Sequence, residues 1–580
     1  MTLSSITEMA NELTDEIDIA SAEEMLRLLR QTDQQMFEGY KAYESMKDQP
    51  FRDRLARAVA LIRQFENAAK ETDQKFKIIL SGAGTSGRLA MLIARQFNQA
   101  LAGSGVAVEF DYLIAGSDLA LIKAQEGAED DPLQGRQDLL EKTQGTNIFI
   151  YIGITCGFSA PYVAGQLDYA VYERNQAAFL IGFNPPDRAR RNTPENWDKS
   201  FYQVVNELIG NERFELLNPV VGPEPITGST RMKGGSATKM ILEILFTLAY
   251  LPRAESLWPE LAVLGVNEPM DGYRSLLAGF QRAKDYVYEQ TEKIAPALIS
   301  AGESLKHNGH IYYLGEDVAG CLGIVDASEC PPTYGADFHD IRGFIENGWA
   351  GFSPTSRDLS TVDSLFDIGF DSFQAHCLPT LGINDLVVIT GSDGFHAKQV
   401  QWIDVCKEKG ARLFRVLLAQ RRHTSSLTDF DLVLDANEFQ ATTPWEIGLA
   451  VKLVFNAITT AAHVFKGKVY KNRMVDLRIS NNKLYYRSIN IIKELMRVDS
   501  ERAEICVLRA IYGSDTISEE TLTAPISHHV AHAVAQGKIV PLALIMAASD
   551  STYNQALDHL SRQPVIRHVV EEFQKEQRHL

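Results

Sequence analysis

The sequence predicts an α/β protein with two doubly wound parallel sheets in tandem, followed by a helical C-terminal region. Short apolar strands run into glycine-rich turns and then into helices, as in KFKIILSGAGTSGRLAMLIARQF and NIFIYIGITCGFSAPYVAGQL. This alternation is typical of a parallel sheet covered by helices. The same order returns in HIYYLGEDVAGCLGIVDASEC and NDLVVITGSDGFHAKQVQWI. Beyond about residue 470 a helical periodicity of apolar residues replaces it.

Composition limits the classes of function. A chain of 580 residues is longer than one hydrophobic core usually organises, so at least two domains are expected. The net charge of -18 opposes binding to nucleic acid or anionic lipid. The 6 cysteines include no C-x-x-C pair, which is typical of reduced cytosolic thiols and predicts neither disulfides nor zinc. Because the start is polar and acidic and no apolar run reaches about 20 residues, we expect a cytoplasmic protein without a membrane partner.

Four parts follow one another along the chain. Apolar residues at helical spacing predict an N-terminal helical arm over residues 1–55. The strand, turn and helix pattern then predicts one α/β domain over residues 56–275 and a second over residues 276–469. Helical periodicity alone predicts a lid over residues 470–580.

The two α/β domains arise from an internal duplication. An ungapped alignment of their first turns pairs Gly82 with Gly315 and Gly87 with Gly320. Glycines fix backbone conformation, so their recurrence at the same spacing predicts the same local fold in both halves.

The first turn, GAGTSG, follows a strand and opens a helix. Backbone N–H groups and the positive end of the helix dipole favour an anion there, near Gly84, and Thr85 and Ser86 add two hydroxyl donors. The turn also satisfies G-x-G-x-x-G, for which Glu109 or Asp111 could bind a ribose. A nucleotide site, a phosphosugar site and a purely structural turn all remain open on this motif alone.

Two further loops favour a phosphosugar. Thr155, Gly157 and Ser159 follow the next strand, so their small polar groups are expected at the same edge of the sheet. The loop TGSTRMKGG brings Arg231 and Lys233 to the start of another helix, where they are candidates for phosphate binding. The alternative for this loop is an N-capped helix with solvated basic residues.

The motifs GAGTSGRL, EGAED, TGSTRMKGGSATK, DASECPPTYG and KVYKNRMVDLRISNNKL together resemble the sugar isomerase (SIS) family, which has a flavodoxin-like fold. The resemblance is to N-acetylmuramic acid 6-phosphate etherases and to glucokinase regulatory proteins. Etherases carry one SIS domain per chain, whereas the regulatory proteins carry two in tandem and a helical lid. The resemblance therefore implies the layout of the regulatory proteins for nearly the whole chain.

The resemblance to etherases also implies roles for single residues. Glu129 of EGAED would be the base and Glu329 of DASEC the acid that together eliminate lactate from the sugar, without a metal or organic cofactor. Lys483 would contact the sugar phosphate from the lid. Without the resemblance, Glu129 and Lys483 would be assigned to the solvated surface, because Glu and Lys are mostly exposed.

The two repeats lack complementary parts of such a site. Repeat one has Gln96 where the alignment with Glu329 calls for a glutamate. Repeat two has Val318 and Ala319 where the alignment with the first turn calls for hydroxyl groups. We therefore expect one composite site per chain.

Two functions use the same predicted pocket. The expected one is an etherase, a carbon–oxygen lyase that converts N-acetylmuramic acid 6-phosphate to N-acetylglucosamine 6-phosphate and D-lactate. The alternative is a regulator that binds fructose phosphates and inhibits a hexokinase or glucokinase partner. The etherase is favoured because DASECPPT is retained and because residues 437–444, where such regulators dock their kinase, are largely polar.

Overall fold

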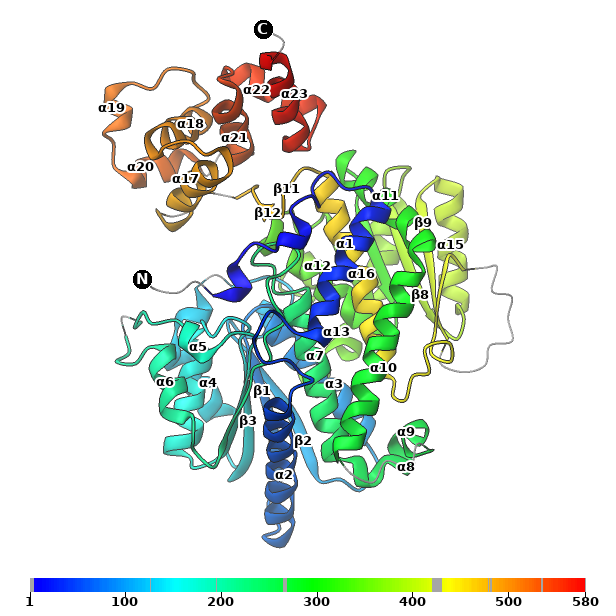
Figure 1. Ribbon diagram of the computed structural model, residues 1–580. Coiled ribbons are helices and arrows are strands. Elements are labelled where there is room, and N and C mark those ends of the chain that lie inside the picture. The colour runs from blue at the N-terminus through cyan, green and yellow to red at the C-terminus, as the bar shows by residue number, and fades with distance from the viewer. Residues whose placement is uncertain are drawn as a thin grey trace.

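The computed structural model describes residues 5–125, 127–194, 196–263, 269–419, 430–477, 479, 482–533 and 536–578. It contains two five-stranded parallel sheets and a helical C-terminal lid, so the predicted α/β fold is confirmed (Figure 1). The first sheet has the order β2-β1-β3-β4-β5 and the second has the order β7-β6-β8-β9-β10. In each sheet the second strand of the domain lies at one edge and the first strand lies next to it, followed by the third, fourth and fifth. This shared strand order confirms the duplication.

The strands of the first sheet are β1 (Phe76–Gly82), β2 (Val108–Ile114), β3 (Ile148–Ile154), β4 (Ala177–Ile181) and β5 (Phe214–Leu217). Those of the second sheet are β6 (Ile311–Gly315), β7 (Ile341–Ile345), β8 (Leu386–Ser392), β9 (Arg412–Ala419) and β10 (Leu432–Asp435). In both sheets the chain reverses its direction of winding after the second strand. Ligands of doubly wound folds bind at this point, outside the carboxyl ends of the strands.

Equivalent glycines make equivalent contacts in the two domains. A Cβ on Gly87 would lie 2.8 Å from the carbonyl oxygen of Gly82 and 2.4 Å from Ile114. A Cβ on Gly320 would lie 2.3 Å from the carbonyl oxygen of Gly315 and 2.6 Å from the Ile345 side chain. Each glycine therefore lets the first helix of its domain pack directly on the first two strands.

The helices of the arm and first domain are α1 (Ala22–Glu38), α2 (Gln49–Glu71), α3 (Thr85–Leu101), α4 (Pro132–Lys142), α5 (Pro161–Asp168), α6 (Phe201–Leu208), α7 (Lys233–Ala249), α8 (Ala254–Leu257) and α9 (Pro259–Val263). Those of the second domain are α10 (Pro269–Glu289), α11 (Thr291–Lys306), α12 (Asp317–Tyr334), α13 (Gly348–Phe352), α14 (Phe370–Ser372), α15 (Ala397–Lys409) and α16 (Trp445–Phe465). A hairpin of β11 (Val469–Tyr470) and β12 (Arg473–Met474) leads to the lid helices α17 (Asn482–Met496), α18 (Ser500–Tyr512), α19 (Glu519–Leu522), α20 (Ile526–Ala533), α21 (Ile539–Ser549), α22 (Tyr553–Arg562) and α23 (Ile566–Arg578).

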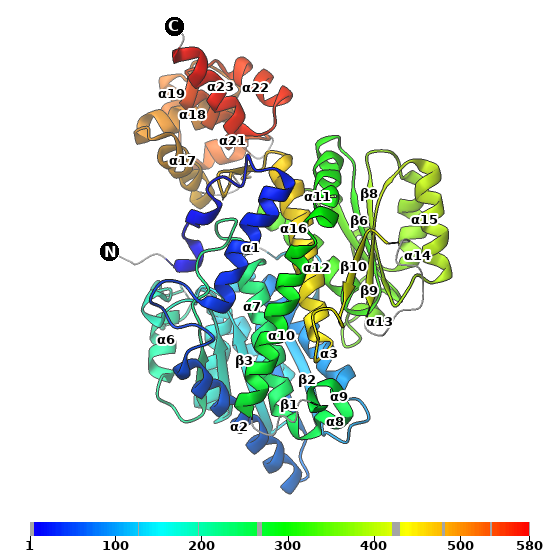
Figure 2. The same ribbon diagram turned by 45° about the vertical axis from the view of Figure 1, so that its right-hand side comes forward.

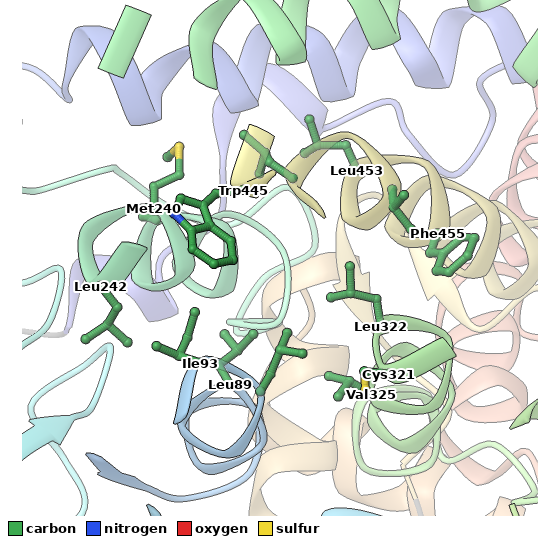
Figure 3. Packing of buried hydrophobic residues seen from close by; sticks show 14 of the residues in the cluster. Leu89, Ile93, Met240, Leu242, Cys321, Leu322, Val325, Trp445, Leu453 and Phe455 are labelled. Atoms are coloured by element: carbon green, nitrogen blue, oxygen red, sulfur yellow. The ribbon is translucent and has the colours of Figure 1, made fainter. Parts of the chain in front are cut away.

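One apolar core joins the two domains. Figure 3 shows Met240 of α7 beside Trp445 of α16, with Leu89 and Ile93 of α3 below them and Leu322 of α12 below α16. By length and composition α16 could cross a membrane, but its apolar window is wholly buried inside the protein. Its apolar character is therefore explained by its position at the centre of the domain interface.

The lid has a hydrophobic core of its own, separate from that of the two domains. It lies above them, at the end of the molecule that carries the hairpin and the start of the N-terminal arm (Figures 1 and 2). Gly467, just after α16, has a φ of +81°, and a Cβ there would lie 1.8 Å from the carbonyl oxygen of Pro564 in the lid. Only glycine allows this close backbone approach.

We expect Gly467→Ala to destabilise the seating of the lid by about 2 kcal/mol or more, because backbone overlap and a left-handed φ cannot be relieved by a side-chain rotation. Thermal unfolding and limited proteolysis between the second domain and the lid would measure the effect. Gly382→Ala is the matched control, since a Cβ at Gly382 meets nothing within 4 Å. Equal stability of the two variants would contradict the packing described.

Candidate functional site

A cavity of about 690 Å³ opens at the carboxyl ends of β1 and β3, where the winding of the first sheet reverses. Its lining comes from the first domain, the N-terminal arm and the lid. The lining residues are Ser5, Thr7, Glu8, Ala83, Ser86, Glu129, Ile154, Thr155, Cys156, Gly157, Ser159, Ala160, Arg190, Asn192, Gly228, Thr230 and Arg487. The predicted edge of the sheet therefore does carry a polar cavity.

The N-terminus of α3 opens beside this cavity. Its cap residue, Gly84, has a φ of +52° and no side chain of the described chain caps the helix. Ser86 reaches the cavity, whereas Gly84 and Thr85 are not among its described lining residues. The uncapped N–H groups and the helix dipole favour an anion at this point.

The loop after β3 supplies the second set of predicted residues. Thr155, Gly157 and Ser159 all line the cavity, and the Thr155 hydroxyl accepts a hydrogen bond from the Ser159 N–H at 3.3 Å. Cys156, between Thr155 and Gly157 in the sequence, also lines the cavity, and burial raises the pKa of its thiol to about 12. The thiol is therefore protonated at neutral pH and lacks the thiolate that a nucleophile needs.

Lys233 is not among the described residues that line the cavity, contrary to its predicted role as a phosphate ligand. It is fully buried, and its ammonium donates a hydrogen bond to the Val221 carbonyl at 2.8 Å. The N-terminus of α7 is already occupied by a carboxylate, because the N–H groups of Lys233 and Gly234 each donate to Glu224 at 2.8 Å. A phosphate would have to displace this internal anion.

Arg231 also differs from its predicted role, because it joins the two domains. It is 2% exposed and pairs with Asp326 of α12 at 2.8 Å. It also donates hydrogen bonds to the hydroxyls of Tyr334 and Thr460, at 3.1 Å and 2.8 Å. Its neighbours Gly228 and Thr230 line the cavity instead.

Glu129 and Glu329 do not share one pocket in the described structure. Glu129 is exposed and lines the cavity. Glu329 is buried in α12, where it forms an ion pair with Arg88 of α3. The segment around Glu329 contacts the first domain at Arg88 of α3, but Glu329 is not among the described residues that line the cavity, so the composite site stays a prediction.

Sequence reasoning missed several lining residues. Arg487 of the lid follows Lys483 by four residues, a spacing that places both on one face of α17, so this signal was available. The side chain of Lys483 lies outside the described residues. Arg190, and the N-terminal residues Ser5 and Glu8, carry no local motif that would have indicated their place in the lining.

The corresponding edge of the second sheet carries carboxylates. Glu316, which follows β6, lies 3.0 Å from His396, which precedes α15. Asp317, at the start of α12, pairs with Arg95 of α3 at 2.8 Å. Asp317 is engaged with the first domain, and Val318 and Ala319 lack the hydroxyl groups of Thr85 and Ser86, so this edge does not reproduce the first site.

We expect Arg88→Met to lower the free energy of unfolding by about 3 to 5 kcal/mol, because it leaves Glu329 buried without its cation. The double variant Arg88→Met/Glu329→Gln should recover part of this loss, since the uncompensated charge is removed. The midpoint of urea unfolding would measure both. A single variant as stable as the wild type would show that this ion pair has no structural role.

Sequence comparison identifies relatives for the whole chain. Residues 60–171 match the N-terminal SIS domain of glucokinase regulatory protein, residues 288–406 its second SIS domain, and residues 471–570 its C-terminal lid domain. Glucokinase regulatory protein from Xenopus laevis is 31% identical over 583 residues, covering 98% of this chain and 92% of that protein. The Homo sapiens protein is 33% identical over 583 residues, covering 97% and 91%.

Similarity to etherases is partial. N-acetylmuramic acid 6-phosphate etherase from Bacillus cytotoxicus is 33% identical over 218 residues, which covers only 37% of this chain. The predicted etherase function and lyase activity are therefore wrong, since the relatives that span the chain, including its lid, are regulatory proteins. The polar character of residues 437–444 did not justify preferring the enzyme. With two SIS domains, a lid and regulatory relatives that cover 97% and 98% of it, the chain belongs to the glucokinase regulatory protein family.

Proposed function

We propose that the chain is a regulatory protein that binds a sugar phosphate in the first-domain cavity and, in response, changes its inhibition of a glucokinase-type hexokinase. The kinase is proposed from the relatives that span the chain, which are glucokinase regulatory proteins. The ligand class is proposed from the cavity itself. Fructose phosphates are the candidate effectors.

One observation carries the ligand class: an uncapped helix N-terminus opens beside a cavity with hydroxyl and guanidinium groups around it. Ser86 lies in the first turn of α3, Arg487 adds positive charge from the lid, and Arg190, which pairs with Asp130 at 2.6 Å, adds a second guanidinium group. This combination suits a phosphate. The carboxylates of Glu8 and Glu129 can accept hydrogen bonds from sugar hydroxyls.

The same cavity supports binding without turnover. Elimination of lactate needs an acid and a base on one substrate, and Glu329 is engaged with Arg88. Cys156, which does reach the cavity, is held as a neutral thiol by its burial. A ligand bound here can therefore be held by side chains such as Ser86 and Arg487. Glu329, the predicted acid, is not among the described lining residues.

We expect the purified chain to slow glucose phosphorylation by a glucokinase, and fructose 6-phosphate or fructose 1-phosphate to alter that inhibition. Ser86→Ala, which gives the first turn the residue that repeat two has at Ala319, should weaken fructose phosphate binding about tenfold through loss of one hydrogen bond to a charged group. Titration calorimetry and a coupled kinase assay would measure the two effects.

Ser360→Ala, in a loop of the second domain, is the control and should leave both readouts unchanged. The proposal fails if the chain leaves glucokinase activity unaltered with and without sugar phosphates. Release of lactate from N-acetylmuramic acid 6-phosphate would instead demonstrate etherase activity.

A further inference from the structure

The N-terminal strap, which we define as residues 5–18, runs between the cavity and the lid. In both views it passes along the lower side of the lid before entering α1 (Figures 1 and 2). Its contacts fall into three groups along its length, at the cavity, at the loop that leads into α7, and at the lid.

At the cavity, the strap forms part of the wall. Ser5, Thr7 and Glu8 all line it. The strap is fixed there by Asn184, whose side chain accepts a hydrogen bond from the buried Ile6 N–H at 2.9 Å. Asn184 also donates to the carbonyl of Gly157, a cavity residue, at 3.0 Å. The position of the strap is therefore tied to that of the loop after β3.

In its middle, the strap holds the loop that precedes α7. The Asn11 side chain donates to the carbonyl of Pro223 at 2.7 Å, and the Thr14 hydroxyl donates to that of Pro225 at 2.8 Å. Asn472 of the hairpin donates to the carbonyl of Asn11 at 2.7 Å. The strap thus links this loop to the hairpin from which the lid begins.

At its far end, the strap contacts the lid through charged groups. Arg567 of α23 donates to the carbonyl of Asp15 at 3.0 Å and lies 3.3 Å from the Asp18 carboxylate. Its second terminal nitrogen lies 3.1 Å from Glu16. Lys471 of the hairpin pairs with Asp15 at 2.7 Å, and its N–H donates to Asp18 at 2.7 Å.

These contacts matter because the lid has a separate core. Parts with separate cores and polar contacts between them move relative to one another by default, so specific clamps such as the strap determine how firmly the lid is seated. Asp18 is 2% exposed, and removing Arg567 would leave its carboxylate without one of its partners.

Resting on the proposed function, we infer that the strap is a further ligand-contacting element of the sugar-phosphate site and that it couples occupancy of the site to seating of the lid. A sugar phosphate that contacts Thr7 and Glu8 holds the strap in the place from which Asp15 and Asp18 bind Arg567. By thermodynamic linkage, a firmly seated lid in turn strengthens sugar-phosphate binding. Arg567 acts as a positioning residue, because it lies outside the cavity lining.

The test is the affinity of the full chain for fructose phosphates after a change at the lid end of the strap. We expect Arg567→Met to weaken binding by about fivefold or more, the lower end of usual coupling between sites. Arg562→Met is the matched control, because this exposed lid arginine pairs at 2.6 Å with Asp558 of its own helix. It should leave affinity unchanged.

The single variant Asp18→Asn and the double variant Asp18→Asn/Arg567→Met complete a double-mutant cycle for the contact between these two residues. We expect the two single effects on affinity to be non-additive, and we expect a bound fructose phosphate to slow backbone hydrogen exchange in α23 of the wild type and less so in Arg567→Met. Retention of secondary structure, followed by circular dichroism, separates loss of coupling from loss of folding.

Wild-type affinity in Arg567→Met, or exchange in α23 that does not respond to the ligand, would overturn the coupling while leaving the proposed regulator intact. Absence of fructose phosphate binding to the wild type would overturn both. Inhibition of glucokinase without any sugar phosphate is a separate readout, so failure of the regulator and failure of the strap are distinguishable.

Discussion

The buried pair of Arg231 and Asp326 is the constraint on which the arrangement of the two SIS domains depends. Because breaking a buried ion pair leaves an uncompensated charge, this pair ties the segment before α7 to the middle of α12. Lys452 of α16 joins the same contact by donating to the Arg231 carbonyl at 2.6 Å. The apolar side chains of α3, α7, α12 and α16 then pack around this polar centre. The two SIS domains therefore share one hydrophobic core, whereas the lid has a separate core.

This shared centre makes the two halves unequal in function. α3 keeps an uncapped N-terminus beside the first cavity, while α12 uses its first residue, Asp317, to bind Arg95 of the first domain. The duplication preserves the glycines that pack helix on strand, because these contacts are internal to each domain. The side chains that follow them diverge, because one turn faces a cavity and the other faces the partner domain. One site per chain remains a prediction that this asymmetry supports.

The local sequence pattern predicted those features of the structure that depend on residues close together in the sequence. The two sheets, the duplication and the placement of Ser86, Thr155 and Ser159 at one sheet edge all follow from strand, turn and helix order. The roles of Arg231 and Lys233 did not, because nothing near them in the sequence shows that Asp326 and Glu224 will meet them in a buried setting. The N-terminal wall of the cavity was missed for the same reason, since residues 5–8 reach it from the far end of the chain.

These long-range contacts explain why the sequence led to the wrong prediction of an etherase. DASECPPTYG, the motif that favoured an etherase, supplies Asp326, Glu329 and Tyr334, and TGSTRMKGG supplies Arg231, which binds Asp326 and Tyr334. Both motifs therefore supply contacts between the two SIS domains, whether or not the joined domains catalyse a reaction. Retention of a motif reports chemistry only where its side chains face the ligand. Here Arg231, Asp326, Glu329 and Tyr334 make contacts between the domains. The function of the cavity therefore has to be inferred from the residues that line it.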